Sequence, residues 1–164
     1  MPFTLDKSFK IDIGHRIWNE DMRVGRASEL YSSSSPFPYN KCTSLHGHSL
    51  QVSFLFESKD LDEHGFVLDS NLLKAPLLEL IGKVDHALII DKNDPLFSTI
   101  TDLCKKEKLK FYPVDFCPSF EALAKFFFDE CQKILSQCNQ QEFRLQKVKI
   151  SGAKMSVEAT YATN

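Results

Sequence analysis

Two segments of the chain alternate between apolar and polar side chains, and each carries histidine on its apolar side. In residues 3–15 the odd positions are apolar with one exception, and His15 stands at the end of that row. In residues 46–57 the even positions form the apolar row, which starts with His46 and His48. Alternation with a period of two is typical of a strand that buries one face. We therefore predict two half-buried strands whose core-facing sides are continued by three imidazoles.

Two later segments repeat apolar residues at helical spacing. The first begins after Asp69, which can cap a helix, and its apolar stripe reaches Val84. Pro76 is expected to kink this helix or to break one turn. The second helix fits residues 119–136.

Two closing strands, over residues 145–151 and 157–163, complete the pattern. Residues 87–117 are mixed, and within them residues 91–95 (Asp-Lys-Asn-Asp-Pro) indicate a turn. The order strand, strand, helix, helix, strand, strand favours a single α+β domain over residues 1–164. Such a domain would place two helices on one face of a four-stranded antiparallel sheet.

Residues 16–41 show no clear periodicity and include the stretch Ser-Ser-Ser-Ser-Pro-Phe-Pro. Irregular segments of this length inside a compact domain are usually functional or mobile. We expect a long loop insertion here that acts as a lid or as part of an interface.

Composition excludes several classes of protein. The 20 Lys and Arg residues nearly balance the 22 Asp and Glu residues, which excludes the strongly basic surface of a dedicated nucleic-acid binder. No apolar run approaches the ~20 residues that span a bilayer, and no signal peptide is visible. Five scattered cysteines suggest reduced thiols, so we expect a cytoplasmic protein that does not bind membranes.

The three histidines form a candidate zinc site. His46 and His48 are two residues apart in a strand and so point to the same side, and His15 ends the core-facing side of the neighbouring strand. Three protein ligands leave the fourth position of a zinc ion for water or substrate, which is the catalytic arrangement. The alternative is that His46 and His48 are only hydrogen-bonded residues at the start of a strand.

Two further groups have open roles. Cys42 lies four residues before His46, where it could close the metal site as a fourth ligand or act as a base or nucleophile beside the metal. The dipeptide Asp85-His86 offers a carboxylate that can orient an imidazole for proton transfer, although such a pair is also common in ordinary loops.

Taken together, these motifs resemble the 6-pyruvoyltetrahydropterin synthase superfamily. The resemblance extends along most of the chain and is carried by His15-Arg16, residues 42–48, residues 65–74, residues 84–86 with Asn93, and residues 118–124. The three-residue gap between Cys42 and His46 is similar to that of the bacterial 6-carboxytetrahydropterin synthases of queuosine biosynthesis.

The resemblance implies a zinc-dependent lyase. It implies zinc held by His15, His46 and His48, with Cys42 as the proton-abstracting base and Asp85-His86 as a proton relay. The implied substrate is of the 7,8-dihydroneopterin triphosphate type. The implied products are 6-carboxy-5,6,7,8-tetrahydropterin, acetaldehyde and triphosphate. The implied fold is the T-fold, which assembles into β-barrels as a homo-oligomer with active sites between subunits.

The substrate-anchoring part departs from the family pattern. Where the family has a Glu-Thr pair that binds the pterin edge, this chain has Gly152-Ala153. Glu158 could substitute, or it is simply an exposed strand residue; with Ser119, at the start of the second helix, it is a candidate substrate-binding residue. Cations that could bind triphosphate are present but are expected to be ordinary surface charges: Arg16, Arg23, Arg26, Lys41 and Lys74.

Other functions stay open at this point. The chain could be a 6-pyruvoyltetrahydropterin synthase or a family member with an altered substrate. It could instead be a non-catalytic, zinc-stabilised T-fold protein that binds a partner or another heterocycle. The plainest alternative is an α+β domain with incidental histidines.

Overall fold

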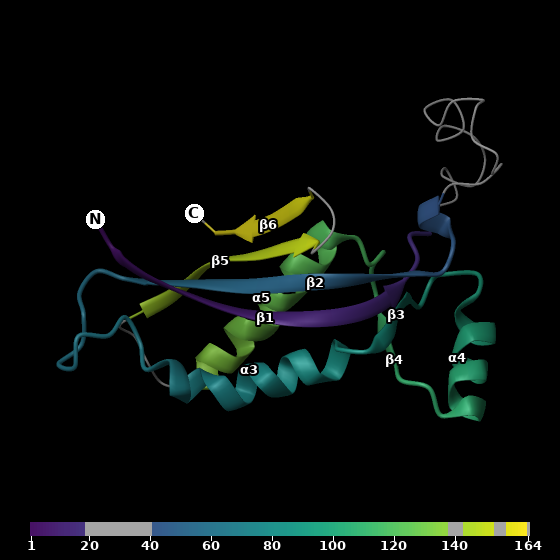
Figure 1. Ribbon diagram of the computed structural model, residues 1–164, viewed down its shortest axis with the longest axis horizontal. Helices are drawn as coiled ribbons and strands as arrows, with labels where there is room; N and C mark the ends of the chain where they lie inside the picture. Colours follow the sequence, from purple (N-terminus) through teal and green to yellow (C-terminus); the bar gives the residue numbers. More distant parts are fainter. Residues whose placement is uncertain (19–40, 138–142, 153–156, 164) are drawn as a thin grey trace. The chain divides into compact units, whose positions relative to one another are not determined.

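The computed structural model describes residues 1–18, 41–137, 143–152 and 157–163 (Figure 1). In chain order the elements are β1 (Phe3–His15), the 3-10 helix η1 (Lys41–Thr43), β2 (His46–Ser58), α3 (Ser70–Val84), β3 (Ala87–Asp91), α4 (Phe97–Glu107), β4 (Phe111–Val114), α5 (Phe120–Gln137), β5 (Phe143–Gly152) and β6 (Glu158–Ala162). Most of the expected loop at residues 16–41 lies outside the described ranges, so its role as a lid or interface stays a prediction.

The strands form one six-stranded mixed sheet in the order β4-β3-β1-β2-β5-β6. β5 pairs antiparallel with β2 and with β6, whereas β3 pairs parallel with β1 and with β4. The four strands expected from the sequence are all present. The predicted four-stranded antiparallel sheet is nevertheless wrong, because two parallel strands extend it beyond β1.

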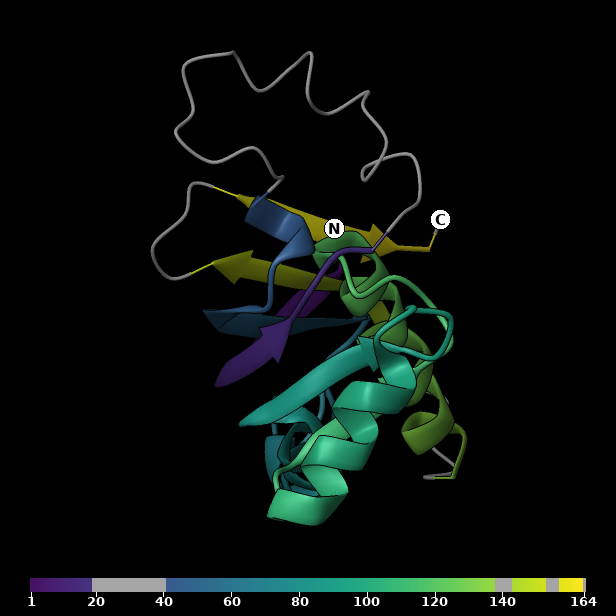
Figure 2. The same cartoon turned by 90° about the vertical axis from the view of Figure 1, so that its right-hand side faces the viewer.

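The region between residues 87 and 117 accounts for this difference. Residues 88–90 are apolar without alternation, a pattern typical of a buried parallel strand that periodicity alone does not distinguish from a buried helix. Helix α4 packs on this strand through Ile100 and Cys104, which contact Ile90 (Figure 2). The turn predicted at residues 91–95 is present and joins β3 to α4 within a strand–helix–strand unit that the sequence did not predict. The described part of the chain therefore has three α-helices rather than two.

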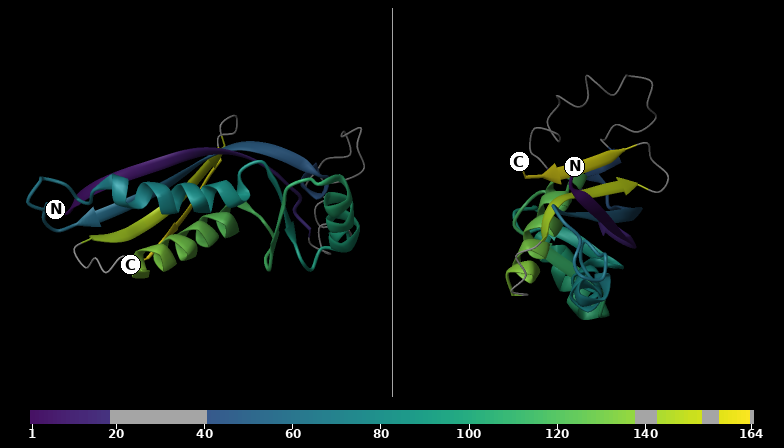
Figure 3. Two further views of the ribbon diagram at one scale, coloured as in Figure 1. Left: turned by 90° about the horizontal axis from the view of Figure 1, so that it is seen from below. Right: turned by 90° about the vertical axis from the view of Figure 1, so that its left-hand side faces the viewer.

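Contacts divide the chain into two compact units. The first comprises Met1–Ile11, Ser49–Asp85 and Phe120–Asn164, and the second comprises Asp12–His48 and His86–Ser119. In the first unit α3 and α5 lie side by side on one face of the strands, as expected (Figure 3). The rings of Phe54 in β2 and Phe127 in α5 meet edge to face at 6.2 Å in the core of this unit.

The ends of α3 follow from its sequence. The Asp69 carboxylate accepts a hydrogen bond from the Asn71 N–H at 2.9 Å, which confirms the predicted N-cap. The helix continues through Pro76 without a break and ends at Asp85. The next residue, His86, has a φ of 57°, a left-handed conformation that is uncommon outside glycine. Within the described ranges, no helix is both long and apolar enough to cross a membrane.

Two neighbouring leucines of α3 test the packing of the first unit. Leu77 is fully buried, whereas Leu78 is 46% exposed. We expect Leu77→Ala to lower the free energy of unfolding by about 2–5 kcal/mol, because it leaves a cavity in the core. Leu78→Ala, the matched control, should change it by less than about 0.5 kcal/mol. Urea unfolding of the two variants measures both values, and equal losses would contradict the burial of this helix face.

Candidate metal centre

Three imidazoles converge where β1 ends and β2 begins. His15 is the last residue of β1, and His46 and His48 open β2. The ring centroids of His15 lie 4.6 Å from those of His46 and 5.0 Å from those of His48, and the latter two are 4.8 Å apart. One ring nitrogen of each lies within 4.8 Å of the other two. The structure therefore brings together the three histidines that the alternation placed on core-facing sides.

Gly47 lets the two strands approach closely at this point. A Cβ atom at position 47 would lie 3.1 Å from the carbonyl oxygen of Ile13 in β1, which is tighter than ordinary van der Waals contact. A larger residue between the two histidines would therefore push β2 away from β1. The spacing of the three rings depends on glycine at this position.

Hydrogen bonds fix the tautomers of two rings. Nδ1 of His15 lies 2.7 Å from the carbonyl oxygen of Pro118, and Nδ1 of His46 lies 2.8 Å from that of Ser44. Because a carbonyl can only accept, both Nδ1 atoms carry the proton and donate it. The Nε2 atoms then hold the lone pair, which is the arrangement that orients metal-binding histidines in proteins.

The environment also disfavours the charged form of two of the rings, His15 and His48. The pKa of His15 is lowered to about 4, chiefly because burial disfavours the charged ring; the hydrogen bond to Pro118 opposes the shift, and His46 and His48 add to it. Burial, followed by the charge of His46, lowers the pKa of His48. At neutral pH His15 and His48 are neutral imidazoles, the form that binds a metal.

This donor set fits a transition-metal ion. Three neutral imidazole nitrogens suit Zn²⁺, with one position left for a water or a substrate oxygen. Among the described residues, the cluster within 4.8 Å consists of the three histidines, and the Cys42 sulfur is not a member. The geometry thus favours the catalytic type of site over a closed four-ligand site.

Cys42 lies close by in sequence and in space. It sits in η1, is half-buried, and its carbonyl oxygen accepts a hydrogen bond from the Ile17 N–H at 2.8 Å. Ile17 is two residues beyond His15, so η1 runs alongside the continuation of β1. This backbone contact brings Cys42 near the end of β1, and its sulfur is not among the clustered ligand atoms.

Asp85 and His86 lie elsewhere along the strands. Asp85 is half-buried at the end of α3, and His86 is exposed, with its backbone N–H donating to the Asp12 carbonyl at 2.7 Å. The parallel register pairs Ile89 with His15, so His86 stands three residues back along the strand, roughly 10 Å away. Within one chain, His86 is not brought to the histidine cluster.

The candidate substrate-binding residues have ordinary surroundings. Ser119 is half-buried, and its backbone N–H donates to the Cys117 carbonyl at 2.8 Å. Glu158 is exposed at the start of β6, where its carboxylate lies 3.4 Å from Nζ of Lys149. Gly152 is the last residue of β5, and Ala153 lies outside the described ranges.

A buried ion pair that the sequence did not reveal lies beside the cluster, at the residue that follows His15. The expectation that Arg16 is an ordinary surface charge is wrong: its Nε lies 3.0 Å from Oδ2 of Asp94, and the two side chains are 8% and 1% exposed. The guanidinium also lies 4.8 Å from the ring centre of Trp18. Asp94 comes from the turn between β3 and α4, which the sequence showed only as a turn, so no sequence signal linked it to Arg16.

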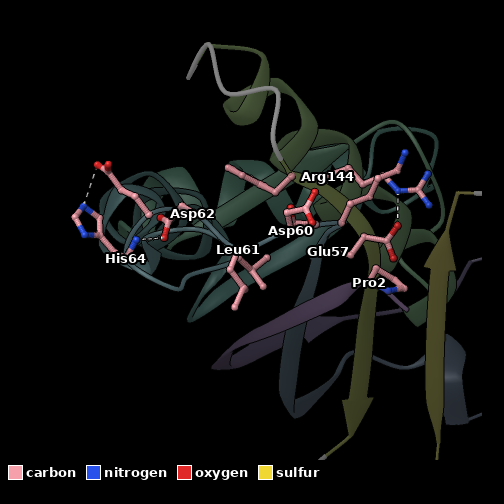
Figure 4. A pocket seen from close by; sticks show the side chains of 12 residues that line it. Pro2, Glu57, Asp60, Leu61, Asp62, His64 and Arg144 are labelled. Atoms are coloured by element: carbon pink, nitrogen blue, oxygen red, sulfur yellow. Dashed lines mark hydrogen bonds and ion pairs between the residues drawn. The ribbon is translucent and has the colours of Figure 1, made fainter.

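A separate pocket of about 1140 Å³ lies in the first compact unit (Figure 4). Four of its 12 lining residues are acidic, and Arg144 donates to the Glu57 carboxylate at 2.6 Å. The Asp62 carboxylate accepts hydrogen bonds from the backbone N–H groups of His64 and Phe66, so it serves its own turn. None of the three clustered histidines lines this pocket.

Comparison with known proteins places this geometry in a family. The model of the family described as 6-pyruvoyl tetrahydropterin synthase matches residues 4–163. The 6-carboxy-5,6,7,8-tetrahydropterin synthase of Aquifex aeolicus is 38% identical over 138 residues, which cover 84% of this chain and 83% of that protein. The protein of the same name from Haemophilus influenzae is 30% identical over 134 residues, with coverages of 77% and 80%.

Solved structures agree on the fold. An uncharacterized protein from Wolinella succinogenes matches with a TM-score of 0.78 at 20% identity, covering 100% of this chain and 99% of that one. The 6-pyruvoyl tetrahydropterin synthase of Caenorhabditis elegans matches with a TM-score of 0.65 at 19% identity, covering 100% and 97%. Since the family model spans nearly the whole sequence, this chain belongs to the 6-pyruvoyl tetrahydropterin synthase family of lyases.

Proposed function

We propose that this chain is a zinc-dependent lyase of the 6-carboxytetrahydropterin synthase type, acting on 7,8-dihydroneopterin triphosphate or a related pterin. The names of its curated relatives support the reaction type. The observation that carries the proposal is the cluster of three histidines, which Cys42 does not close. A role in queuosine biosynthesis and a cytoplasmic location follow from the same resemblance and from the scattered cysteines.

The residues around the cluster suit proton transfer. Bound zinc would supply Lewis acidity that makes side-chain hydroxyl groups of the substrate more acidic. We assign Cys42 as the base that takes a proton from the adjacent carbon, because its side chain is a thiol and its backbone bonds to Ile17, two residues beyond His15. Asp85 orients His86, which returns a proton as general acid.

We further propose that the active site is completed by a second copy of the chain. Within one chain, the register places His86 roughly 10 Å from His15, measured along the strand. This distance is too long for His86 to transfer a proton at a substrate bound to the metal of the same chain. A homo-oligomer, assembled as a β-barrel from T-fold subunits, would bring Asp85 and His86 of one chain to the metal and Cys42 of another.

A second candidate function rests on the replacement of the family's pterin-binding Glu-Thr pair by Gly152-Ala153. Gly152 has no side chain for the two-point contact that the family carboxylate makes, and Glu158 is paired with Lys149. These features favour either a 6-pyruvoyltetrahydropterin synthase activity on a differently held substrate or a non-catalytic, zinc-stabilised binding protein. The assays below separate these outcomes.

Metal content tests the site directly. We expect about one zinc per chain in the purified protein, and His48→Ala should weaken zinc binding by more than about 100-fold because it removes a ligand. His64→Ala is the matched control, since His64 is exposed beside Glu63 and lies outside the cluster. Zinc is measured by mass spectrometry after dialysis. Equal zinc contents in the two variants would contradict the assignment of the ligands.

Product analysis tests the reaction. We expect the zinc-loaded protein to convert 7,8-dihydroneopterin triphosphate into 6-carboxytetrahydropterin with release of acetaldehyde and triphosphate, read by mass spectrometry. A 6-pyruvoyl product without acetaldehyde would establish the alternative synthase activity. Absence of any pterin turnover by zinc-loaded protein would leave the binding-protein alternative.

Mixed oligomers test the division of roles between subunits. Cys42→Ala and His86→Ala should each keep zinc and lose at least about 100-fold in turnover, because each removes one proton-transfer group. If the two groups act in one site from different chains, mixing the variants through unfolding and refolding should restore part of the activity.

Two results would count against this account. Loss of zinc in Cys42→Ala would make Cys42 a structural ligand. Failure of the refolded mixture to regain activity, when wild-type protein regains it after the same treatment, would place both groups in one chain.

A further inference from the structure

The residue that follows His15 takes part in a buried ion pair. Arg16 is the next residue, and its Nε lies 3.0 Å from Oδ2 of Asp94, with both side chains more than nine-tenths buried. Asp94 is itself fixed in the turn before α4. Its Oδ1 accepts the Leu96 N–H at 2.8 Å, and its carbonyl accepts the Phe97 N–H at 2.8 Å. The pair thus joins the end of β1 to a rigid turn.

Stability alone does not explain this pair. Removing two charges from water costs free energy that their mutual attraction often fails to recover, so apolar residues of similar size commonly do as well. A buried pair of opposite charges does, however, hold together the two segments that carry it, because separating the charges would leave each one buried and unpaired. The pair is therefore expected to maintain the position of groups close to it.

The neighbouring geometry is the hydrogen bond that sets the His15 tautomer. Cys117 is hydrogen-bonded to the Trp18 backbone. Pro118, the following residue, accepts the Nδ1–H of His15 at 2.7 Å. Residues 117 and 118 are therefore hydrogen-bonded to the chain on both sides of Arg16, at His15 and at Trp18.

We infer that Arg16 and Asp94 are positioning residues for His15. Their ion pair holds the Pro118 carbonyl on Nδ1, so that the ring keeps one tautomer and presents Nε2 to the metal. This inference rests on the proposed function for the use of that tautomer. The tautomer itself is a property of the metal-free protein and is measured without metal.

A second arginine–carboxylate pair serves as a control. Nε of Arg144 lies 2.6 Å from Oε1 of Glu57, and the Glu57 side chain is 10% exposed (Figure 4). Both residues belong to the first compact unit, which contains none of the three clustered histidines. The Arg144 side chain is 57% exposed, so this pair is less buried than that of Arg16 and Asp94, but breaking it also removes an arginine–carboxylate contact and leaves the segment around His15 untouched.

The experiment compares wild type with Asp94→Asn, the double variant Arg16→Met with Asp94→Asn, and Glu57→Gln. Ring ¹⁵N NMR of His15 in metal-free protein reports the tautomer, and competition with a chromophoric chelator reports zinc affinity. We expect wild type and Glu57→Gln to show only the Nδ1–H tautomer, with equal affinities. Both Asp94 variants should show mixed tautomers and zinc binding weakened about 10–100-fold.

The double variant keeps the inference falsifiable if Asp94→Asn does not fold, because it leaves no unpaired buried arginine. A wild-type tautomer and affinity in the double variant would overturn the inference while leaving the proposed function intact. If wild-type protein bound no zinc, the proposed function would fail, and the tautomer measurement alone would decide the role of the pair.

Discussion

The metal centre depends on how closely β1 and β2 approach at their histidine-bearing ends. Position 47 has room for a hydrogen but hardly for a methyl group, since the Ile13 carbonyl lies 3.1 Å from where a Cβ would stand. Two histidines flank this glycine and face the one that ends β1. Sheet geometry, rather than a flexible loop, therefore sets the distances between the three rings, which gives a preorganised site.

Hydrogen bonds to two backbone carbonyls determine which nitrogen of the His15 and His46 rings carries the proton. The carbonyls of Pro118 and Ser44 occupy the Nδ1 protons of two histidines, which directs their Nε2 lone pairs to the same region. Burial keeps His15 neutral, so the ring is available to a cation without first losing a proton. Both acceptors lie in connecting segments. The orientation of His15 therefore depends on Pro118, which is far from it in the sequence.

The sequence predicted the site better than the sheet. Alternation with a period of two is a local signal, and it located β1 and β2 together with the histidines on their inner faces. Residues 88–90 lack alternation, so β3 and the parallel pairing that follows it were not recognisable, and α4 was missed with them. The pairing of Arg16 with Asp94 was invisible for another reason. It joins residues nearly eighty positions apart, whose contact depends on a strand that the sequence did not reveal.

The candidate substrate-binding residues could also be predicted only in part from the sequence. The resemblance identified Gly152 as a departure from the family pattern, and the structure places Glu158 on an exposed strand beside Lys149. In the proposed homo-oligomer, the group that recognises a pterin would depend on how the subunits meet, which is a property of surfaces rather than of local sequence patterns. Side-chain periodicity reports burial within one chain and says little about contacts made by a second.

X-ray absorption at the zinc edge of the purified protein tests the central claim most directly. Our account predicts a first shell of light atoms at about 2.0–2.1 Å, with the multiple scattering of three imidazoles and one further oxygen. A sulfur shell near 2.3 Å would show that Cys42 closes the site. That result, or a spectrum without imidazole scattering, would contradict a three-histidine centre open to substrate.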